Sequence, residues 1–359
     1  MADDSNSRLA ASLTRRMLLR CRVISFVWID SVDRIAMKLR LLYHGRCFDG
    51  VCSAVVFTRF YSERLHKEAQ IRYRGLHHRP GELFDEEMFD GDENAIVDFK
   101  YSPSERLTWW FDHHQSAFLS PADEEHYRRT KNERKVWDPT RRSCTELIAD
   151  YALARHSFHD PMLDPLVAWA HKIDGALYDS AAEAVELRAP ALQLMLVIES
   201  EEDERFIEGI IRALCVYPLD EVAASDDVQR RFRRALEAQQ QSLGLVQSKA
   251  IYKDGVVFFD LLDEGVETFN KFAPYYLFPE TTYSVALTRS PGRTKISVGS
   301  NPWSPRPRRH NIATICERYG GGGHPVVGAV SFRPDETERA RAVAREIVAE
   351  LSHADGAEK

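Results

Sequence analysis

The sequence predicts an α/β protein of two parts, in which a parallel-sheet domain is joined by a helix to a smaller mixed α/β domain. Three observations lead to this prediction. Short apolar strand segments alternate with helical segments over residues 37–215, charged helix formers with little apolar content fill 216–250, and strand-like segments return over 251–353. We therefore expect a first domain, a linker helix and a second domain with these bounds.

The elements of the first domain follow from apolar patterning. Residues 38–43 read as a short buried strand, and 49–65 read as a helix that the chain enters through Gly50. Two further strands are expected at 95–99 and 107–111, each short, apolar and followed by acidic or histidine residues, as parallel strands that end at a site would be. The remaining helical patterns cover 143–155, 163–172 and 183–197.

The second domain begins after a helical stretch at residues 219–250. The pattern then predicts strands at 255–260, 282–288, 294–298 and 328–333, a helix at 311–319 before a glycine run, and a last amphipathic helix from residue 336. A loop rich in proline and arginine lies at 304–309. These elements suit a small mixed α/β domain.

The composition indicates which kind of partner and which cellular compartment to expect. A net charge of −7 and a pI near 6.0 argue against a protein that coats long duplex nucleic acid, so we expect a small partner. The cysteines are scattered without CxxC pairs, which favours a reducing cytoplasm over a disulfide framework or a thiolate zinc site. No long apolar run predicts a membrane span, and residues 1–36 read as an N-terminal extension without fixed structure, not as a signal peptide.

The residues that carry chemistry are carboxylates and histidines at predicted segment ends. Asp112, His113 and His114 directly follow the strand LTWWF, and a carboxylate with two imidazoles suits metal binding and phosphate contact. Alone, the triplet is also compatible with an exposed turn. Three other segments end in carboxylates in the same way, at Asp49, Asp98 and Asp174.

These motifs resemble those of the DHH phosphoesterases, a family that includes RecJ-type exonucleases, oligoribonucleases, cyclic-dinucleotide phosphodiesterases and manganese pyrophosphatases. HGRCFDGVCSA is similar to the first motif of the family, IVDF to the second, FDHH to the third and HKID to the fourth, in the family's order. Near the C-terminus, GGGH is similar to the substrate-binding motif of the DHH-associated domain. The resemblance covers about residues 38–333.

The resemblance implies a role for each matching residue. Asp98 would bridge two divalent ions, which we expect to be Mn²⁺. One ion would be completed by Asp49, His113 and Asp174, and the other would be bound by His44. His114, with Asp112 beside it, would act at the substrate phosphate. The glycine motif would contact substrate through Gly321, Gly322, Gly323 and His324.

Two positions depart from the family pattern. Cys47 stands near the position of a carboxylate that most members have and this chain lacks. Two roles stay open for Cys47: a soft ligand that favours zinc or iron, or a packed side chain, which is the commoner role for cysteine. Gly299 stands where the family commonly has a phosphate-binding arginine. Arg306 and Arg308 in the following loop could supply that charge, or the loop could be a solvated basic segment. For Trp303, stacking on a base and a role as a packing anchor both stay open.

The sequence therefore predicts a metal-dependent phosphoesterase that hydrolyses phosphodiester or phosphomonoester bonds in short oligonucleotides or small nucleotides. A cyclic-dinucleotide phosphodiesterase is the alternative within the family, because the same centre would serve a cyclic diester. A non-catalytic nucleotide-binding or sensing module is the alternative of another class. A homodimer is compatible with each of these functions, and no membrane partner is expected.

Overall fold

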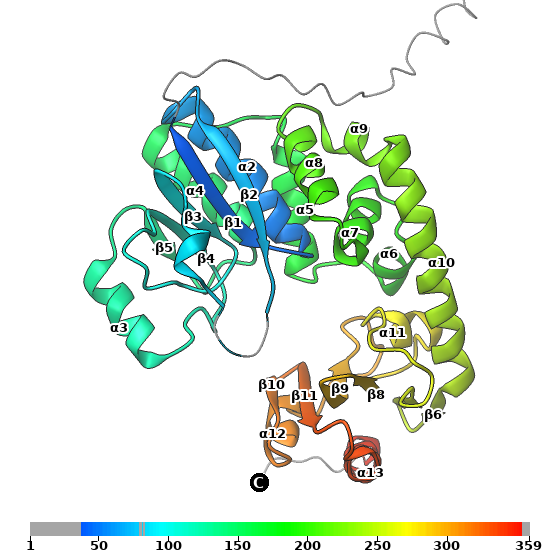
Figure 1. Ribbon diagram of the computed structural model, residues 1–359. Coiled ribbons are helices and arrows are strands. Elements are labelled where there is room, and N and C mark those ends of the chain that lie inside the picture. The colour runs from blue at the N-terminus through cyan, green and yellow to red at the C-terminus, as the bar shows by residue number, and fades with distance from the viewer. Residues whose placement is uncertain (1–36, 79–80, 82, 354–359) are drawn as a thin grey trace, which may run out of the picture. The chain divides into compact units, whose positions relative to one another are not determined.

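The computed structural model describes residues 37–78, 81 and 83–353, and the predicted N-terminal extension at 1–36 lies outside them (Figure 1). Over the described residues the chain forms one five-stranded sheet, sheet A, and one six-stranded sheet, sheet B. This confirms the predicted α/β fold class with a parallel sheet followed by a mixed one. Among the described helices, none combines the length and the apolar content that crossing a membrane requires.

Sheet A is wholly parallel, with the strand order β2-β1-β3-β4-β5. Its strands are β1 (Lys38–His44), β2 (Gln70–Leu76), β3 (Glu93–Val97), β4 (Trp109–Asp112) and β5 (Lys135–Trp137). Tyr43 pairs with Val97, and Val97 with Phe111, so the carboxyl ends of β1, β3 and β4 lie side by side. The sequence analysis missed β2 because it is an edge strand in which exposed Gln70 and Arg72 interrupt the apolar pattern.

Alternating side chains of sheet A enter two cores. Leu41 and Tyr43 pack into a large core with helix α2 (Phe48–Arg64) and helix α4 (Cys144–His156). Leu42 and Trp110 point to the opposite face, where a smaller core forms. Because both faces of the central strands are covered, the stretches LLY of β1, AIV of β3 and WWF of β4 are apolar, which is why these strands were recognisable from their residues alone.

The helical part of the first half differs from the prediction, which did not include the helices at Pro121–Thr130 and Glu204–Leu214. The helix expected at 183–197 is two helices, because Leu187 adopts a left-handed conformation with φ of 52° and Pro190 begins the next helix. The helices that follow β4 are α3 (Pro121–Thr130), α4, α5 (Asp164–Asp174), α6 (Ala181–Glu186), α7 (Pro190–Ser200) and α8 (Glu204–Leu214). A short 3₁₀ helix, η1 (Glu86–Met88), precedes β3.

The long helix predicted at 219–250 is divided at Ser225 into α9 (Leu219–Ala223) and α10 (Asp226–Lys249). Helix α10 contributes to two cores. Val228 and Phe232 near its start pack into the large core of sheet A, whereas Val246 near its end packs with Val257 and Phe259 of sheet B. This position supports the proposal that α10 is the connecting element between the two domains.

Sheet B has the order β10-β11-β9-β8-β7-β6 and is antiparallel except between β7 and β8. Its strands are β6 (Ile251–Lys253), β7 (Val256–Asp260), β8 (Tyr283–Ser290), β9 (Arg293–Ser300), β10 (Gly322–His324) and β11 (Val327–Phe332), with helices α11 (Ala273–Leu277), α12 (Ile312–Glu317) and α13 (Thr337–Ser352). Part of the predicted glycine run is thus a strand. Residues of α13 such as Ala344 and Ile347 pack with Val285 of β8 to form its core.

Candidate metal centre

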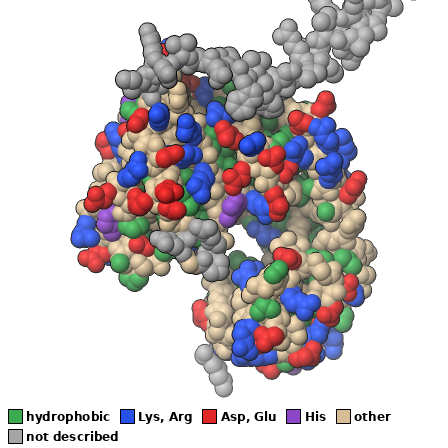
Figure 2. Space-filling view, in the orientation of Figure 1, with side chains coloured by type: hydrophobic (Ala, Val, Ile, Leu, Met, Phe, Trp, Pro, Cys, Tyr) green, Lys and Arg blue, Asp and Glu red, His purple; other side chains and the backbone are tan. Residues whose placement is uncertain are grey.

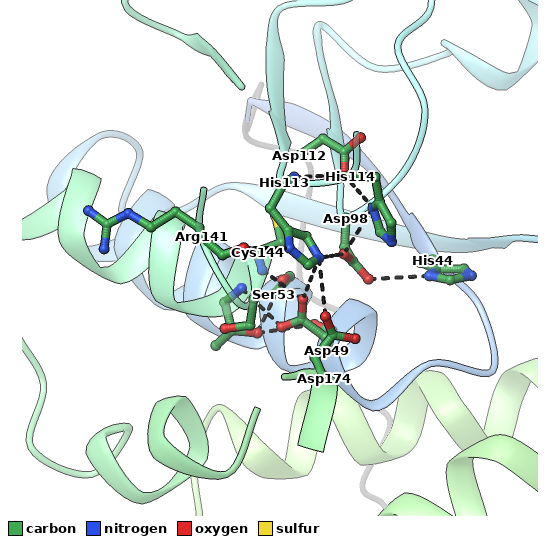
Figure 3. Close-up of polar contacts among 12 residues, drawn as sticks. His44, Asp49, Ser53, Asp98, Asp112, His113, His114, Arg141, Cys144 and Asp174 are labelled. Carbon is green, nitrogen blue, oxygen red and sulfur yellow. Dashed lines mark hydrogen bonds and ion pairs between the residues drawn. The ribbon is translucent and has the colours of Figure 1, made fainter. Parts of the chain in front are cut away.

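The predicted ligands meet at the carboxyl edge of sheet A (Figure 3). His44 ends β1, Asp98 follows β3 by one residue, and Asp112 ends β4 with His113 behind it. These three strands are neighbours and run in the same direction, so their ends share one edge of the sheet. The first turn of α2 and the last turn of α5 supply Asp49 and Asp174 to the same place.

Asp98 lies at the centre of the cluster. Its backbone is left-handed, with φ of 57°, a conformation that aspartate tolerates better than most residues, and its N–H donates to the Phe111 carbonyl at 2.9 Å. Oδ2 lies 3.3 Å from Nδ1 of His44, and Oδ1 lies 3.4 Å from Nε2 of His113. Burial alone would raise the pKa of Asp98, but the contacts with His113 and His44 outweigh it and hold the pKa below its usual range.

Asp49 is fixed by the start of helix α4. Its Oδ2 accepts the N–H of Cys144 at 2.7 Å, and its Oδ1 accepts the N–H of Thr145 at 3.0 Å. These N–H groups belong to the first turn of α4 and have no partner within that helix, so the carboxylate satisfies them and lies at the positive end of the helix. Burial and the nearby carboxylates of Asp98 and Asp174 nevertheless raise the pKa of Asp49 well above its usual value.

His113 points one ring nitrogen at three carboxylates. Its Nε2 lies 3.6 Å from Asp49 Oδ2 and 3.4 Å from Asp174 Oδ2, in addition to its contact with Asp98. Its Nδ1 lies 3.2 Å from the carbonyl oxygen of Arg141, so the Nδ1–H donates there and Nε2 faces the carboxylates. Although burial lowers it, contact with Asp98 and Asp49 raises the pKa of His113 to about 10.

This arrangement fits divalent cations. Buried Oδ1 of Asp98 and Nε2 of His113 have no hydrogen-bond partner among the described residues, although buried polar atoms are normally satisfied. The possible ligands form three groups, and within each group the ligand atoms lie within 4.8 Å of one another. The groups are His44 with Cys47 and Asp98, Asp98 with His113 and His114, and Asp49 with His113 and Asp174. Asp98 belongs to the first two of these groups, and the third adjoins it through His113, whose Nε2 lies 3.4 Å from Asp98 Oδ1.

Asp112 lies behind the cluster. It is fully buried, and its Oδ1 accepts the backbone N–H of His113 at 2.9 Å and the N–H of His114 at 3.3 Å. The same oxygen lies 2.7 Å from Nδ1 of His114. Asp112 therefore holds the loop and the His114 ring, and it belongs to none of the groups of possible ligands found among the described residues.

Two residues near the centre carried no motif in the sequence. The ring of His78 stacks on Phe99 with centroids 4.7 Å apart, and its centroid lies 5.0 Å from that of the His44 ring. Burial and Asp98 raise the pKa of Asp174, and the positive charges of His113, His114 and Lys271 oppose that rise. Neither residue could have been found from local sequence, because each arrives on a separate segment.

Lys271 is placed by its neighbours on both sides. The side-chain amide of Asn270 donates to the Ala184 carbonyl at 3.0 Å, and the Phe272 ring packs on Tyr178 with centroids 5.2 Å apart. Trp303 also joins this packing, since its Nε1 donates to the Tyr178 carbonyl at 3.1 Å. Trp303 is thus the packing anchor of the two roles considered.

The predicted substrate-binding residues lie in sheet B. Gly322, Gly323 and His324 form β10, with Gly321 just before it, and the His324 side chain is exposed. Arg308 donates to the carbonyls of His310 at 2.9 Å and Pro325 at 2.6 Å, which ties the arginine loop to the residue after the glycine motif, and Arg306 is exposed. Among the described residues, no hydrogen bond or ion pair joins these groups to the carboxylate cluster.

Gly299 has a steric reason to lack a side chain. A Cβ atom there would lie 2.4 Å from the hydroxyl oxygen of Tyr275 and 3.3 Å from Oγ of Ser284. Tyr275 and Ser284 hydrogen-bond to each other at 2.9 Å, so this hydroxyl pair fills the space that an arginine at position 299 would cross.

Comparison with known proteins supports the fold. No protein-family model matches the sequence, and neither does any curated protein. Among solved structures, a pGpG-specific phosphodiesterase, PggH, from Vibrio cholerae is similar to this chain. The similar region covers 87% of this chain and 99% of PggH, with a TM-score of 0.61 and 18% sequence identity. The DHH domain of a member of the s1p family of ribosomal proteins is also similar. The similar region covers 88% of this chain and 87% of that domain's chain, with a TM-score of 0.55 and 15% sequence identity. The chain has the fold of these proteins.

Proposed function

We propose that this chain is a metal-dependent phosphoesterase of the DHH family that hydrolyses phosphodiester or phosphomonoester bonds in short oligonucleotides or small nucleotides. One observation carries the proposal: the buried carboxylate of Asp98 presents one oxygen to His44 and the other to His113, with its Oδ1 unpartnered among the described residues. A carboxylate shared in this way is suited to bridging two cations. The order of the sequence motifs and the shared fold agree with this reading.

The proposed cofactor is a pair of divalent cations, with Mn²⁺ at the carboxylate-rich position. Asp49, His113 and Asp174 would hold one ion, His44 would contribute to the other, and Asp98 would serve both. Mixed carboxylate and imidazole donors suit Mn²⁺ better than Mg²⁺ alone. When bound, the cations supply an activated water and neutralise charge on the attacking and leaving oxygens of the phosphate.

The remaining catalytic roles fall to residues of this chain beside the cations. His114 has a side chain 36% exposed, so its ring can reach a substrate phosphate while Asp112 holds its other edge. The raised pKa of His114, where the hydrogen bond to Asp112 outweighs burial, favours the charged imidazolium that a phosphate would attract. Asp112 is proposed to position His114.

Substrate binding in the second domain is proposed for Gly321, Gly322, Gly323 and His324, with Arg306 and Arg308. The exposed His324 and the accessible backbone of the glycines support contact with a phosphate or ribose. Acidic and basic side chains are interspersed over the face shown in Figure 2, which agrees with a small ligand better than with a long duplex. The described cysteines are free, which supports the proposed cytoplasmic location.

A cyclic-dinucleotide phosphodiesterase is the second candidate. The solved structure of PggH is that of a phosphodiesterase specific for pGpG, a linear dinucleotide, which makes dinucleotides the first substrates to test. The alternative of a non-catalytic nucleotide-binding or sensing module predicts binding without turnover.

The test is phosphate or nucleotide release from linear dinucleotides including pGpG, tri- to pentaribonucleotides, 3′-phosphoadenosine 5′-phosphate and cyclic dinucleotides, with and without Mn²⁺. We expect Mn²⁺-dependent turnover that Asp98→Asn and His113→Ala abolish. Asp220→Asn, on the exposed surface of α9, is the matched control and should retain turnover. Binding of a nucleotide without turnover of any substrate would support the sensing module instead.

A further inference from the structure

Two chemically different sets of donors meet at Asp98. On one side are the carboxylates of Asp49 and Asp174 and the imidazole of His113, whose Nε2 lies 3.4 Å from Asp98 Oδ1. On the other side are the imidazole of His44 and the sulfur of Cys47, which lie with an Asp98 oxygen within 4.8 Å of one another. The first set consists of hard oxygen donors and a nitrogen donor, whereas the second contains a thiol, so the two sets favour different metals.

A tight turn brings His44 and Cys47 together. His44 ends strand β1, Cys47 is the residue that precedes the first turn of helix α2, and Arg46 between them is left-handed, with φ of 55°. Gly50 lets the helix approach the strand, because a Cβ at this position would lie 2.2 Å from the His44 carbonyl oxygen. The Cys47 side chain is partly exposed and does not cap the helix in the usual way, and the backbone N–H of Gly50 faces its sulfur.

The carboxylate beside the sulfur gives an independent sign of a ligand. Asp98 is 1% exposed; its Oδ2 faces His44 at 3.3 Å, and its Oδ1, which faces His113 at 3.4 Å, has no hydrogen-bond partner among the described residues. A buried carboxylate with an unpartnered oxygen costs free energy unless a cation or a donor satisfies it. The oxygen, nitrogen and sulfur atoms thus converge on one point from three separate side chains.

Other cysteines in the same domain have ordinary structural roles. The Cys144 thiol donates to the Phe111 carbonyl at 3.3 Å, and Cys52 is fully buried in the large core. Cys215 is partly exposed like Cys47, but its sulfur lies 4.0 Å from the Val55 carbonyl and outside the groups of possible ligands. Cys215 therefore provides a matched control for Cys47.

We propose that Cys47 is a metal ligand and that, with His44 and Asp98, it forms a thiophilic half-site that takes zinc or ferrous iron beside a Mn²⁺ half-site of Asp49, His113 and Asp174. This inference rests on the proposed function, because that function assigns Asp98 to both cations and the two half-sites share this residue. Binding requires the thiolate, so the Cys47 proton passes to solvent as the sulfur–metal bond forms. Thiolate ligands select zinc and iron, whereas carboxylates suit manganese, and this contrast would give the centre two different ions.

Cobalt(II) is the probe for the sulfur ligand. The full chain is freed of metal with a chelator and titrated with Co²⁺ while its near-ultraviolet absorption is recorded, because a thiolate bound to Co²⁺ gives a charge-transfer band that oxygen and nitrogen ligands do not. We expect the band in the unaltered chain and in Cys215→Ser, and its loss in Cys47→Ser. Absence of the band from the unaltered chain, or its survival in Cys47→Ser, would overturn the proposal.

Metal affinity gives a second readout that needs no activity. Because Zn²⁺ outcompetes Mn²⁺ at most nitrogen and oxygen sites, the two ions are titrated separately into the metal-free chain. Cys47→Asp replaces the thiolate by a carboxylate and should lower the ratio of Zn²⁺ affinity to Mn²⁺ affinity, whereas Cys215→Ser should keep the ratio of the unaltered chain. An unchanged ratio in Cys47→Asp would contradict the proposal even if Cys47→Ser were unstable.

These measurements separate the proposal from the proposed function. A cobalt–thiolate band without hydrolysis of any substrate would support the half-site while the phosphoesterase function failed. Mn²⁺-dependent hydrolysis without the band would leave the function standing and remove Cys47 from the ligand set.

Discussion

The Nδ1 atom of His114 lies 2.7 Å from the Oδ1 atom of Asp112. Asp112 is fully buried and His114 is partly exposed, so this contact connects the interior of sheet A to the solvent-facing side of the metal centre. With Nδ1 donating to the carboxylate, the Nε2 atom of His114 is left to meet a substrate. In the proposed function, the chemistry of His114 would thus depend on the buried Asp112.

Replacement of Asp112 should impair His114 without removing the metals. Asp112→Asn keeps an oxygen that can accept the backbone N–H groups but loses the charge that raises the pKa of His114. We expect kcat to fall about 10–100-fold, the range found for residues that orient a functional histidine. The high-pH limb of the kcat profile should move to lower pH, because His114 would lose its proton more easily.

The check for Asp112→Asn is a pH–rate profile with metal content measured on the same samples. Asp220→Asn should leave both unchanged. Loss of metal together with activity would show that Asp112 supports the ligands instead of His114.

The approach of helix α2 to strand β1 should be intolerant of any side chain at position 50. Gly50→Ala would place Cβ 2.2 Å from a backbone carbonyl that cannot move away without shifting His44. We expect a loss of about 1–3 kcal/mol in the free energy of unfolding, typical of overpacking, together with weaker metal binding. Urea unfolding of the metal-free chain and metal titration measure the two effects.

Gly244→Ala is the matched control for Gly50→Ala. Gly244 lies inside helix α10 with no atom within 4 Å of the added Cβ, so alanine should stabilise the chain by about 0.5–1 kcal/mol. Equal effects of the two substitutions would show that the strand–helix contact at Gly50 is not restrictive.

Metal binding should release protons. The pKa of His113 is raised to about 10 by its carboxylate neighbours, so at pH 7 the ring is protonated in the metal-free chain. A cation needs the neutral imidazole, and binding must expel that proton, so metal affinity should rise with pH up to about 10. Titration calorimetry in two buffers of different ionisation enthalpy gives the number of protons released, and an identical binding enthalpy in both buffers would refute the prediction.

Gly299 and Tyr275 should be energetically coupled. Gly299→Ala brings Cβ 2.4 Å from the Tyr275 hydroxyl and should cost about 1–3 kcal/mol of the free energy of unfolding. Tyr275→Phe removes that oxygen and leaves the nearest ring carbon at 3.7 Å, an ordinary contact, at the cost of about 1 kcal/mol for the hydrogen bond to Ser284. The double variant should therefore be more stable than the sum of the two changes predicts.

A double-mutant cycle measured by urea unfolding tests this coupling. Additive effects would mean that the backbone of β9 moves to admit the methyl group, and would reopen position 299 to a larger side chain.

The sequence indicated much of the candidate metal centre because its proposed ligands follow parallel strands. His44, Asp98 and Asp112 each lie at or just after a strand end, and strand ends of a parallel sheet share an edge, so local patterns and their order were enough to bring them together. The edge strand β2 and the division of the helix at Leu187 escaped detection, since an edge position tolerates polar residues and a left-handed C-cap does not require glycine.

What the sequence by itself determined is the parallel sheet, the joining helix and the set of carboxylates and imidazoles at the sheet edge, because periodicity and residue type are local properties. The tertiary structure alone decided which donors surround each oxygen of Asp98, that the Arg141 carbonyl orients His113, and that Tyr275 closes the space beside Gly299. These are contacts between segments far apart in the chain, and their geometry is set by how the cores pack, which no local pattern specifies.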